Sequence, residues 1–237
     1  MGLADLHIHT IYSYDGTASV PAVLRRAREI GLDVIAITDH DEITGSLRAL
    51  ELASHYGVQV IPGMEVTTAE GDLLALNVNV KIPRNLPLTE TILRVGELGG
   101  FCIVPHPMAG GFGMRGLSAY SILKSLRHPD VPQILIAIET YNATTIDRLS
   151  NHYAGILAER VKLAQIGSSD AHVVGAIGLG FTEFDGYSVQ DLLEALHYRG
   201  TEIRKRKQWH PVQILGSWAA NYVSSTFTRL GQTQYRG

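Results

Sequence analysis

The first residues of the chain carry an aspartate and two histidines at a spacing of two. Apolar and polar residues alternate from Leu3 to His9, which is typical of a half-buried strand. Because side chains repeat every two residues along a strand, Asp5, His7 and His9 share one face. Two imidazoles about 7 Å apart at their Cα atoms can close on one ion. Ten histidines in 237 residues also produce such a pair by chance, so a metal site requires further ligands.

Further candidate ligands follow the other predicted strands, in the order His40, Glu65, His106, Asp170 and His172. In α/β barrels and open α/β sheets alike, the carboxyl ends of the strands meet on one face. We therefore expect these side chains to converge with His7 and His9. Imidazoles and carboxylates without thiolates suit Zn, Mn or Fe. Because the ligands outnumber the needs of one ion, the sequence predicts a cluster of two or three metals.

Strand and helix patterns alternate along most of the chain. Strands are predicted at 3–9, 34–38, 58–61, 73–80, 101–104, 134–138 and 161–166, with a short strand or loop at 179–184. Helices are predicted at 20–30, 47–53, 88–98, 117–126, 144–160 and 189–198. This alternation indicates a single α/β domain, either a closed barrel or an open doubly wound sheet. No glycine-rich phosphate loop follows the first strand, which counts against a dinucleotide-binding fold.

Composition and charge exclude several classes of protein. The net charge of −3 provides no basic field for non-specific binding to nucleic acid. The single Cys102 lies in an apolar run, so neither a disulfide framework nor a cysteine-ligated zinc is expected. We see no signal peptide and no apolar run of membrane-spanning length. The expected protein is soluble and cytoplasmic, with no membrane partner.

The motifs, taken together, resemble one known family. They are Asp5-Leu6-His7-Ile8-His9-Thr10, Tyr14-Asp15-Gly16-Thr17, Ile37-Thr38-Asp39-His40-Asp41, Gly63-Met64-Glu65, His106-Pro107, Ile138-Glu139-Thr140-Tyr141-Asn142 and Ser169-Asp170-Ala171-His172. In order and spacing they are similar to those of the PHP (polymerase and histidinol phosphatase) family of metal-dependent phosphoesterases, over about residues 3–205. The resemblance implies a distorted (β/α)7 TIM-like barrel with a trinuclear metal site.

The resemblance also implies which residues hold each metal. It assigns His7, His9, Glu65 and Asp170 to the first ion, Glu65 and His106 to the second, and Asp15, His40 and His172 to the third. The chain departs from the family where many members have a histidine shortly after the bridging glutamate. Asp72 stands there instead, either as a replacement ligand or as a turn residue after Gly71. Without a ligand at Asp72, the cluster would be binuclear.

Other residues are candidates for catalysis and substrate binding. Asp41 and His172 are candidates for proton transfer. Asp5 and Asp39 are expected to orient imidazoles through hydrogen bonds, and the alternative for Asp39 is an N-cap or turn carboxylate. Arg115 follows the glycine-rich loop 109–113, which we expect to be mobile. A guanidinium there can bind substrate phosphate, and the alternative is a solvated loop arginine.

The expected activity is hydrolysis of a small phosphomonoester, such as a nucleotide or a compound like histidinol phosphate. Two or three divalent ions (Mn, Zn or Fe) would bridge the hydroxide that attacks phosphorus. Phosphate at the 3′ or 5′ end of a nucleic acid is a further substrate to consider. Two alternatives remain open, namely a non-catalytic PHP scaffold and an amidohydrolase-like metal hydrolase.

The end of the chain is predicted to lie outside the barrel. We assign residues 1–205 to the PHP barrel domain and residues 206–237 to a C-terminal extension. Apolar residues recur at helical spacing in that extension, at Val212, Leu215, Trp218, Ala219, Tyr222, Val223, Thr226 and Phe227. Such an amphipathic helix can pack on the barrel or on a second subunit, which would make a homo-oligomer. The basic run 204–207 is interpreted as solvated surface.

Overall fold

Short apolar runs form the central strands. The computed structural model describes the chain except residues 112–113, 146–147, 207–212, 214–215, 223–225 and 227–237. All four residues of β2 (Val34–Ile37) are buried, and so are all four of β5 (Phe101–Val104). Continuous burial of this kind is expected of strands that are covered on both faces. These strands therefore have helices on one side and barrel interior on the other.

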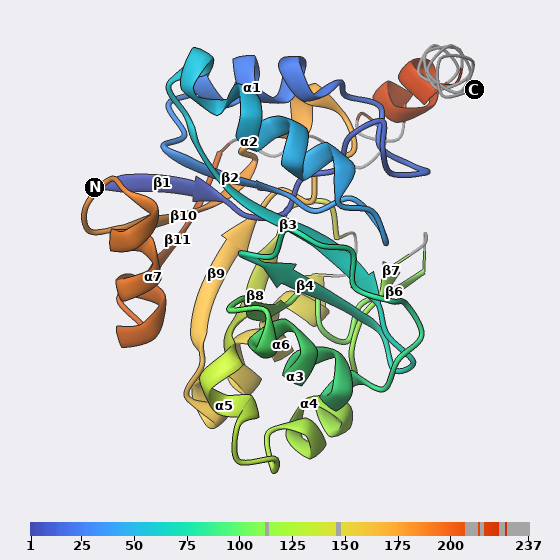
Figure 1. Ribbon diagram of the computed structural model, residues 1–237, viewed down its shortest axis with the longest axis vertical. Helices are drawn as coiled ribbons and strands as arrows, with labels where there is room; N and C mark the ends of the chain where they lie inside the picture. Colours follow the sequence, from blue (N-terminus) through green and yellow to red (C-terminus); the bar gives the residue numbers. More distant parts are fainter. Residues whose placement is uncertain (112–113, 146–147, 207–212, 214–215, 223–225, 227–237) are drawn as a thin grey trace.

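Nine strands form one mixed sheet (Figure 1). Its order is β11 (Glu202–Lys205), β10 (Gly180–Phe184), β1 (Gly2–Asp5), β2, β3 (Gln59–Thr67), β4 (Asp72–Leu76), β5, β8 (Leu135–Asn142) and β9 (Ala164–Ser168). The pairs β1–β2, β2–β3, β5–β8 and β8–β9 are parallel. The pairs β1–β10, β10–β11, β3–β4 and β4–β5 are antiparallel. The antiparallel pairs are what distorts the barrel.

The sheet curls until its last strand approaches β10. The hydroxyl of Thr182 in β10 accepts a hydrogen bond from the Gly167 amide of β9 (3.1 Å) and donates one to the Gly167 carbonyl (2.9 Å). Residues from eight strands also meet in a single buried cluster, which includes Ala4, Ala36, Leu74, Ile103, Ala137 and Ile166. The last strand, β9, also contacts β10, β11 and β1, which stand at the other end of the sheet order and would lie far from β9 in an open sheet. The sheet is therefore a nearly closed barrel.

Helices cover the outside of this barrel, except α7 (Val189–Tyr198), which packs on its interior cluster. The others are α1 (Val20–Glu29), α2 (Thr44–Tyr56), α3 (Leu88–Glu97), α4 (Ala119–Ser125), α5 (Val131–Ile134) and α6 (Arg148–Val161). The helices α1 and α2 lie side by side against one part of the sheet, while α3 and α6 pack on β4, β5 and β8 (Figure 1). Leu192 and Leu196 of α7 join the interior cluster. Each helix thus buries one apolar face.

The expected fold class, a distorted TIM-like barrel, is confirmed, with differences at the ends of elements. Regular pairing of the first strand ends at Asp5, four residues before its predicted end. The strand predicted at 73–80 ends at Leu76 and turns at Asn77, whose φ is +58°. The glycine-rich loop contains a small hairpin, β6 (Gly110–Gly111) with β7 (Met114–Arg115). Part of the basic run forms β11, whose Arg204 is exposed and ion-paired with Glu183 and Glu202.

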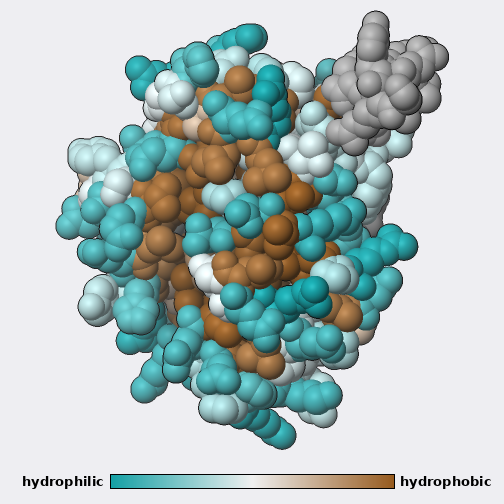
Figure 2. Space-filling view, in the orientation of Figure 1, coloured by the Kyte–Doolittle hydropathy of each residue, from teal (hydrophilic) through white to brown (hydrophobic). Residues whose placement is uncertain are grey.

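The C-terminal extension is described only in part. Residues 216–222 are helical, whereas Val212, Leu215, Val223 and Phe227 lie outside the described residues. The division at residue 205 stays a prediction. Among the residues that the structure describes, no helix is both long and apolar enough to cross a lipid bilayer. Hydrophobic side chains gather across the middle of the face in Figure 2, with hydrophilic residues around them.

Candidate metal centre

The segment after β1 carries the first two candidate ligands. Ile8 makes a parallel bridge to Ala171, so the chain stays extended beyond the regular strand. Leu6 belongs to the buried cluster inside the barrel, and Ile8 belongs to the cluster that contains the apolar face of α1. The two imidazole rings are 5.1 Å apart, and both are fully buried. The alternation read from the sequence therefore does place both imidazoles together.

Glu65 lies at the middle of the centre, near the end of β3. Its Oε2 is 3.1 Å from His7 Nε2, 3.3 Å from His9 Nε2 and 3.3 Å from His40 Nδ1. Its Oε1 is 3.1 Å from His106 Nε2. A backbone bridge between His40 and Glu65 fixes the segment after β2 beside β3. One carboxylate thus faces imidazoles through both of its oxygens, the arrangement that a bridging ligand needs.

Two further carboxylates complete the cluster. Asp170 follows β9 with a φ of +50°, and its Oδ1 lies 3.4 Å from His7 Nε2 and 3.3 Å from His9 Nε2. Asp15 comes from the loop before α1, and its Oδ2 lies 3.1 Å from His172 Nε2 and 3.3 Å from His40 Nε2. The side chains of His40 and His172 are 11% and 19% exposed, so the centre opens to solvent on this side.

These side chains form three overlapping groups, each with ligand atoms within 4.8 Å of one another. The groups are His7–His9–Asp170, His7–Glu65–His106 and His9–Asp15–His40–His172. Both ring nitrogens of His9 and Nδ1 of His106 are buried and make no hydrogen bond to any described residue. Because buried polar atoms are normally hydrogen-bonded, His9 Nε2, which lies 3.3 Å from both Glu65 Oε2 and Asp170 Oδ1, fits a metal ligand. The donor set suits Zn, Mn or Fe.

The centre is strongly coupled electrostatically. Burial by itself would raise the pKa of Glu65, but the facing His40 and His7 outweigh burial and hold that pKa well below its usual value. Burial likewise works against a charged His7, yet Asp170 and Glu65 raise the pKa of its imidazole. Without a cation, positive charge in this cluster comes from protons on the histidines. A metal ion would take over that role.

Glu139 makes hydrogen bonds to two residues that carry candidate ligands, His7 and His106, and the sequence did not predict this role. Its Oε1 lies 3.1 Å from His7 Nδ1, and its Oε2 accepts a 2.6 Å hydrogen bond from the His106 amide. Asn142 donates to Glu139 (2.9 Å) and to Asp170 (3.0 Å), and Ser168 also donates to Glu139. Partners of this kind fix the orientation of ligand imidazoles. The available signal was a glutamate and an asparagine at the end of one predicted strand.

In the part of the chain that the structure describes, Asp5 and Asp39 do not orient imidazoles, and the contacts of Asp39 agree with the alternative of a carboxylate that holds local backbone. The carboxylate of Asp5 accepts hydrogen bonds from the amides of Ser169 (3.0 Å) and Gly178 (2.9 Å). That of Asp39 accepts from the amide (2.6 Å) and hydroxyl (2.7 Å) of Thr10. Within the described residues, neither carboxylate is hydrogen-bonded to an imidazole. Both instead hold the loops that carry the ligands.

Asp72 and Arg115 meet at the edge of the centre. Asp72 is buried, outside the three groups, and its Oδ2 accepts a 3.1 Å hydrogen bond from the Arg115 amide. Its Oδ1 is buried and has no hydrogen-bond partner among the described residues. Burial and then the charge of Glu65 raise the pKa of Asp72 to about 6. The Arg115 side chain is exposed beside Thr68. A ligand role for Asp72 therefore stays a prediction.

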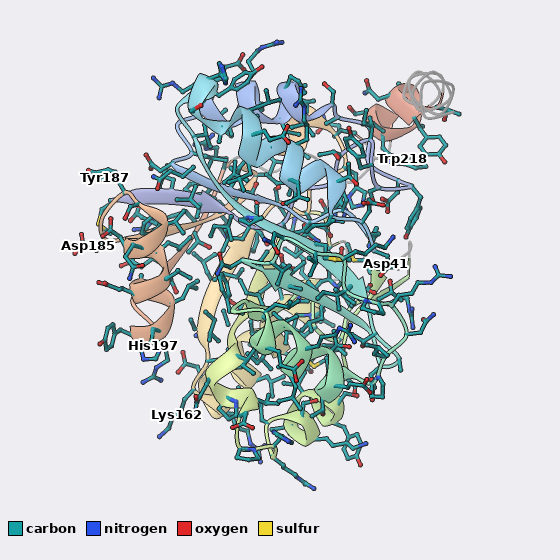
Figure 3. The ribbon with its side chains drawn as sticks, viewed as in Figure 1. Asp41, Lys162, Asp185, Tyr187, His197 and Trp218 are labelled. Atoms are coloured by element: carbon teal, nitrogen blue, oxygen red, sulfur yellow. The ribbon has the colours of Figure 1, made fainter. Side chains whose placement is uncertain are left out.

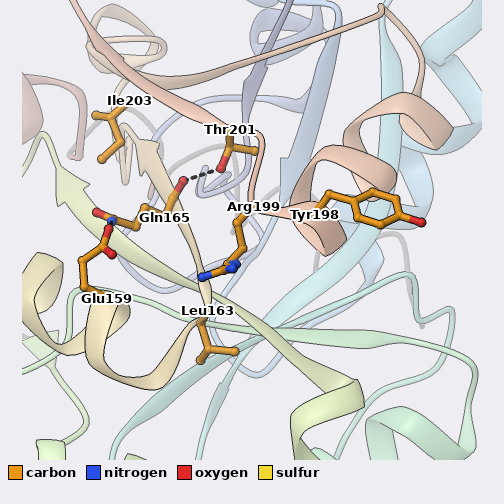
Figure 4. Close-up of a pocket in the computed structure, with 7 residues that line it drawn as sticks. All are labelled: Glu159, Leu163, Gln165, Tyr198, Arg199, Thr201 and Ile203. Carbon is orange, nitrogen blue, oxygen red and sulfur yellow. Dashed lines mark hydrogen bonds between the residues drawn. The ribbon is translucent and has the colours of Figure 1, made fainter.

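The other predicted residues lie around or away from the centre. Asp41 borders it, and its Oδ1 accepts a 2.9 Å hydrogen bond from the Thr67 amide. Figure 3 shows Asp41 on the opposite side of the view from Lys162 and His197. A cavity of about 390 Å³ (Figure 4) is lined by Glu159, Leu163, Gln165, Tyr198, Arg199, Thr201 and Ile203. None of these lining residues belongs to the three ligand groups.

Comparisons with known proteins agree with this geometry. The PHP domain model matches residues 5–203. An uncharacterized protein from Methanocaldococcus jannaschii is 34% identical over 161 residues, which cover 64% of this chain and 88% of that protein. A phosphoribosyl 1,2-cyclic phosphate 1,2-diphosphodiesterase from Eggerthella lenta is 40% identical over 65 residues, which cover 27% of this chain and 24% of that enzyme.

A solved structure shares the fold. It is a two-domain protein from Bacteroides vulgatus containing a predicted PHP-like metal-dependent phosphoesterase, with a TM-score of 0.69 and 20% identity. The match covers 86% of this chain and 64% of that longer one. The family match spans every candidate ligand from His7 to His172. The chain therefore belongs to the PHP domain family.

Proposed function

We propose that this protein is a metal-dependent phosphomonoesterase that acts on a small phosphorylated compound. The observation that carries the proposal is Glu65, whose two oxygens face imidazoles on both sides. A carboxylate in that position can join two ions into one cluster. When bound, two or three Zn, Mn or Fe ions would supply charge neutralisation and an acidified water. The protein's own part is to hold these ions and to orient the ester.

The chain offers three groups around the open side of the centre. His172 lies between two carboxylates, with Nε2 facing Asp15 and Nδ1 facing Asp170, and we propose that it is a metal ligand. Asp41 uses Oδ1 to hold the Thr67 amide, which leaves Oδ2 to carry a proton to the leaving oxygen. Arg115 extends from the hairpin beside Asp72 and would bind phosphate oxygens from that side. His172 is the alternative proton carrier if it leaves its ion during turnover.

An exposed aromatic residue supports a substrate that contains a ring. The Tyr14 ring is stacked on the His40 ring, with centroids 5.0 Å apart and planes 20° apart. Tyr14 is 62% exposed and therefore lies where the centre meets solvent. A planar leaving group can stack on such a residue. We propose a nucleotide or a compound like histidinol phosphate as the substrate class.

Metal content and phosphate release test the proposal together. The protein would be loaded separately with Mn²⁺, Zn²⁺ and Fe²⁺, its ions counted by elemental analysis, and its activity screened on mononucleotides, histidinol phosphate and glycerol phosphate. We expect two or three ions per chain and faster release from the ring-containing esters. Glu65→Gln should abolish release, whereas the matched change Glu97→Gln, at an exposed position on α3, should not. A fully loaded protein that hydrolyses no phosphate ester would refute the function, and absence of bound metal would favour a scaffold.

A further inference from the structure

The helix in the C-terminal extension touches the metal centre through one indole group. Trp218 Nε1 donates a 2.8 Å hydrogen bond to the main-chain carbonyl of Asp15. The same residue packs against the buried cluster that contains Ile8, Val20 and Ala171. Trp218 lies beyond residue 203, where the family match ends. A segment outside the family match therefore contacts the loop that carries a candidate ligand.

The loop held by this contact is tightly folded. The Ile11 amide donates to Ala18, and the Thr17 amide donates to His172, both at 2.9 Å. Gly16 is required between them, since a Cβ there would lie 2.1 Å from the Thr10 carbonyl oxygen. Within the loop, Asp15 presents Oδ2 to His40 and His172. The position of the Asp15 main chain therefore decides whether its carboxylate reaches the two imidazoles.

A second aromatic residue fixes the indole. Tyr222 lies one helical turn after Trp218, and the two rings are 4.8 Å apart with planes 32° apart. Residues four apart on a helix share a face, so both rings are on one side of this helix. The indole is thus packed on the core cluster and on Tyr222 while its N–H points at Asp15. This is a specific contact and not a loose apolar one.

We infer that Trp218 is a positioning residue, which holds the Asp15 loop so that Asp15, His40 and His172 can bind one ion. The inference rests on the proposed function in assuming that these three residues are ligands. The coupling between docking of this helix and binding of the ion is reciprocal by thermodynamic necessity. Docking of the helix favours the ion, and the ion favours docking of the helix. The group His7–Glu65–His106 shares no residue with the group that contains Asp15, so an ion there would depend less on this contact.

The test compares Trp218→Phe, which keeps a ring and removes the N–H, with Tyr198→Phe, which changes an exposed ring on α7. Equilibrium dialysis of the full-length metal-free proteins against Mn²⁺ or Zn²⁺ gives the affinity for each ion. Loss of one neutral hydrogen bond predicts that a single ion binds about three- to tenfold more weakly in Trp218→Phe, with the others unchanged. A general structural defect would instead weaken all the ions. Tyr198→Phe should match the parent.

Hydrogen exchange provides a measurement that needs no activity. In metal-free protein, the peptide covering residues 10–18 should exchange faster in Trp218→Phe than in the parent. In the parent, adding metal should slow exchange in the peptide that carries Trp218, and this holds even if the variant fails to fold. Equal exchange and equal affinities would refute the positioning role alone. A parent protein that binds no ion would refute the proposed function. Hydrogen exchange of the metal-free proteins would still show whether Trp218 holds the Asp15 loop.

Discussion

At the scale of single residues, the centre is built so that carboxylates and imidazoles alternate. Glu65, Asp15 and Asp170 each face at least two imidazoles at 3.1–3.5 Å. No lysine or arginine takes part in these ion pairs among the described residues. Three carboxylates packed this closely require compensating positive charge. Metal ions bound among these side chains would supply that charge at neutral pH, and the three groups of ligand atoms are able to hold them.

Removing His40 tests the open part of the centre. His40→Ala deletes an imidazole that faces both Asp15 and Glu65. We expect the loss of one ion and of most turnover, by more than about 100-fold, since direct ligands matter more than their hydrogen-bond partners. The barrel should stay folded by circular dichroism. His55→Ala, at an exposed position on α2, is the matched control. Parent-like activity of His40→Ala with Mn, Zn and Co would contradict the ligand role.

Glu139 can be tested by an almost isosteric change. Glu139→Gln keeps the size of the side chain but removes the charge beside His7 Nδ1. The His7 imidazole would lose the partner that sets its tautomer, so metal affinity should fall about 10- to 100-fold. Competition with a chromophoric chelator measures this affinity. The exposed Glu159 of α6 offers Glu159→Gln as a control. Unchanged affinity in Glu139→Gln would show that Glu139 serves the fold alone.

Metal binding should depend on pH because protons compete for the histidines. Burial opposes protonation of His40 and of His106, yet the adjacent Glu65 outweighs burial and raises the pKa of both imidazoles above 6.5. The metal-free centre therefore keeps protons as the pH rises through 6.5, and each ion must displace them. Affinity should increase with pH above 6.5, with proton release that is larger near pH 6.5 than near pH 8. Calorimetry in two buffers of different ionisation enthalpy measures this release, and an affinity independent of pH would contradict it.

At the scale of elements, sequence patterns predict where strands lie but not how loops close around their ends. The runs at 34–38 and 101–104 are buried strands, as expected, because continuous apolar residues suit only a covered strand. The alternation of apolar and polar residues correctly placed His7 and His9 on one face, because side chains repeat every two residues along an extended chain. It also placed Asp5 on their face, but the strand's neighbours gave Asp5 two loop amides instead. Period-two patterns specify a face of one strand, and the partner across that face depends on tertiary packing.

The loop residues show the same limit more strongly. Asp15 follows no strand pattern and was identified only through the family resemblance, although its carboxylate contacts His40 and His172. The hairpin that brings Arg115 to Asp72 is formed by dipeptides too short to produce a periodic signal. The indole contact of Trp218 joins residues 203 positions apart in the sequence. Contacts of this length depend on the whole fold and cannot be read from local spacing.

The helix α7 allows stability to be separated from the metal centre. Ser188 caps α7 by accepting from the Asp191 amide, and the Asp191 side chain accepts from the Ser188 amide. Ser188→Ala should lower the free energy of unfolding by about 1 kcal/mol, the usual cost of losing an N-cap. Metal stoichiometry should not change, because α7 carries none of the candidate ligands. Urea unfolding and elemental analysis measure the two effects, and a change in stoichiometry would mean that α7 is coupled to the centre.

At the scale of the whole molecule, the centre joins parts of the barrel that are distant in the sheet. His7 follows β1, Glu65 belongs to β3, His106 follows β5 and Asp170 follows β9. In sheet order, β9 stands at one end and β1 near the other. The barrel is nearly closed between β9 and β10, and the ligands of one cluster span that closure. Bound ions would therefore act as cross-links between strands that hydrogen bonds connect only sparsely.

Chelation should consequently weaken the barrel as a whole. An ion that binds the folded chain but not the unfolded chain stabilises the fold by about 2.7 kcal/mol per site when the free ion concentration is 100 times the dissociation constant. Removing them also leaves Glu65, Asp15 and Asp170 balanced only by protons on histidines. The melting temperature should fall by several degrees in excess chelator, and more at about pH 8 than at about pH 6.5, since fewer histidines stay protonated at the higher pH. Scanning calorimetry measures both differences, and readdition of Mn²⁺ or Zn²⁺ should restore the parent value. If chelator leaves the melting temperature unchanged at both pH values, protein contacts alone hold the strand ends together. The cluster of carboxylates and imidazoles would then be stable without ions.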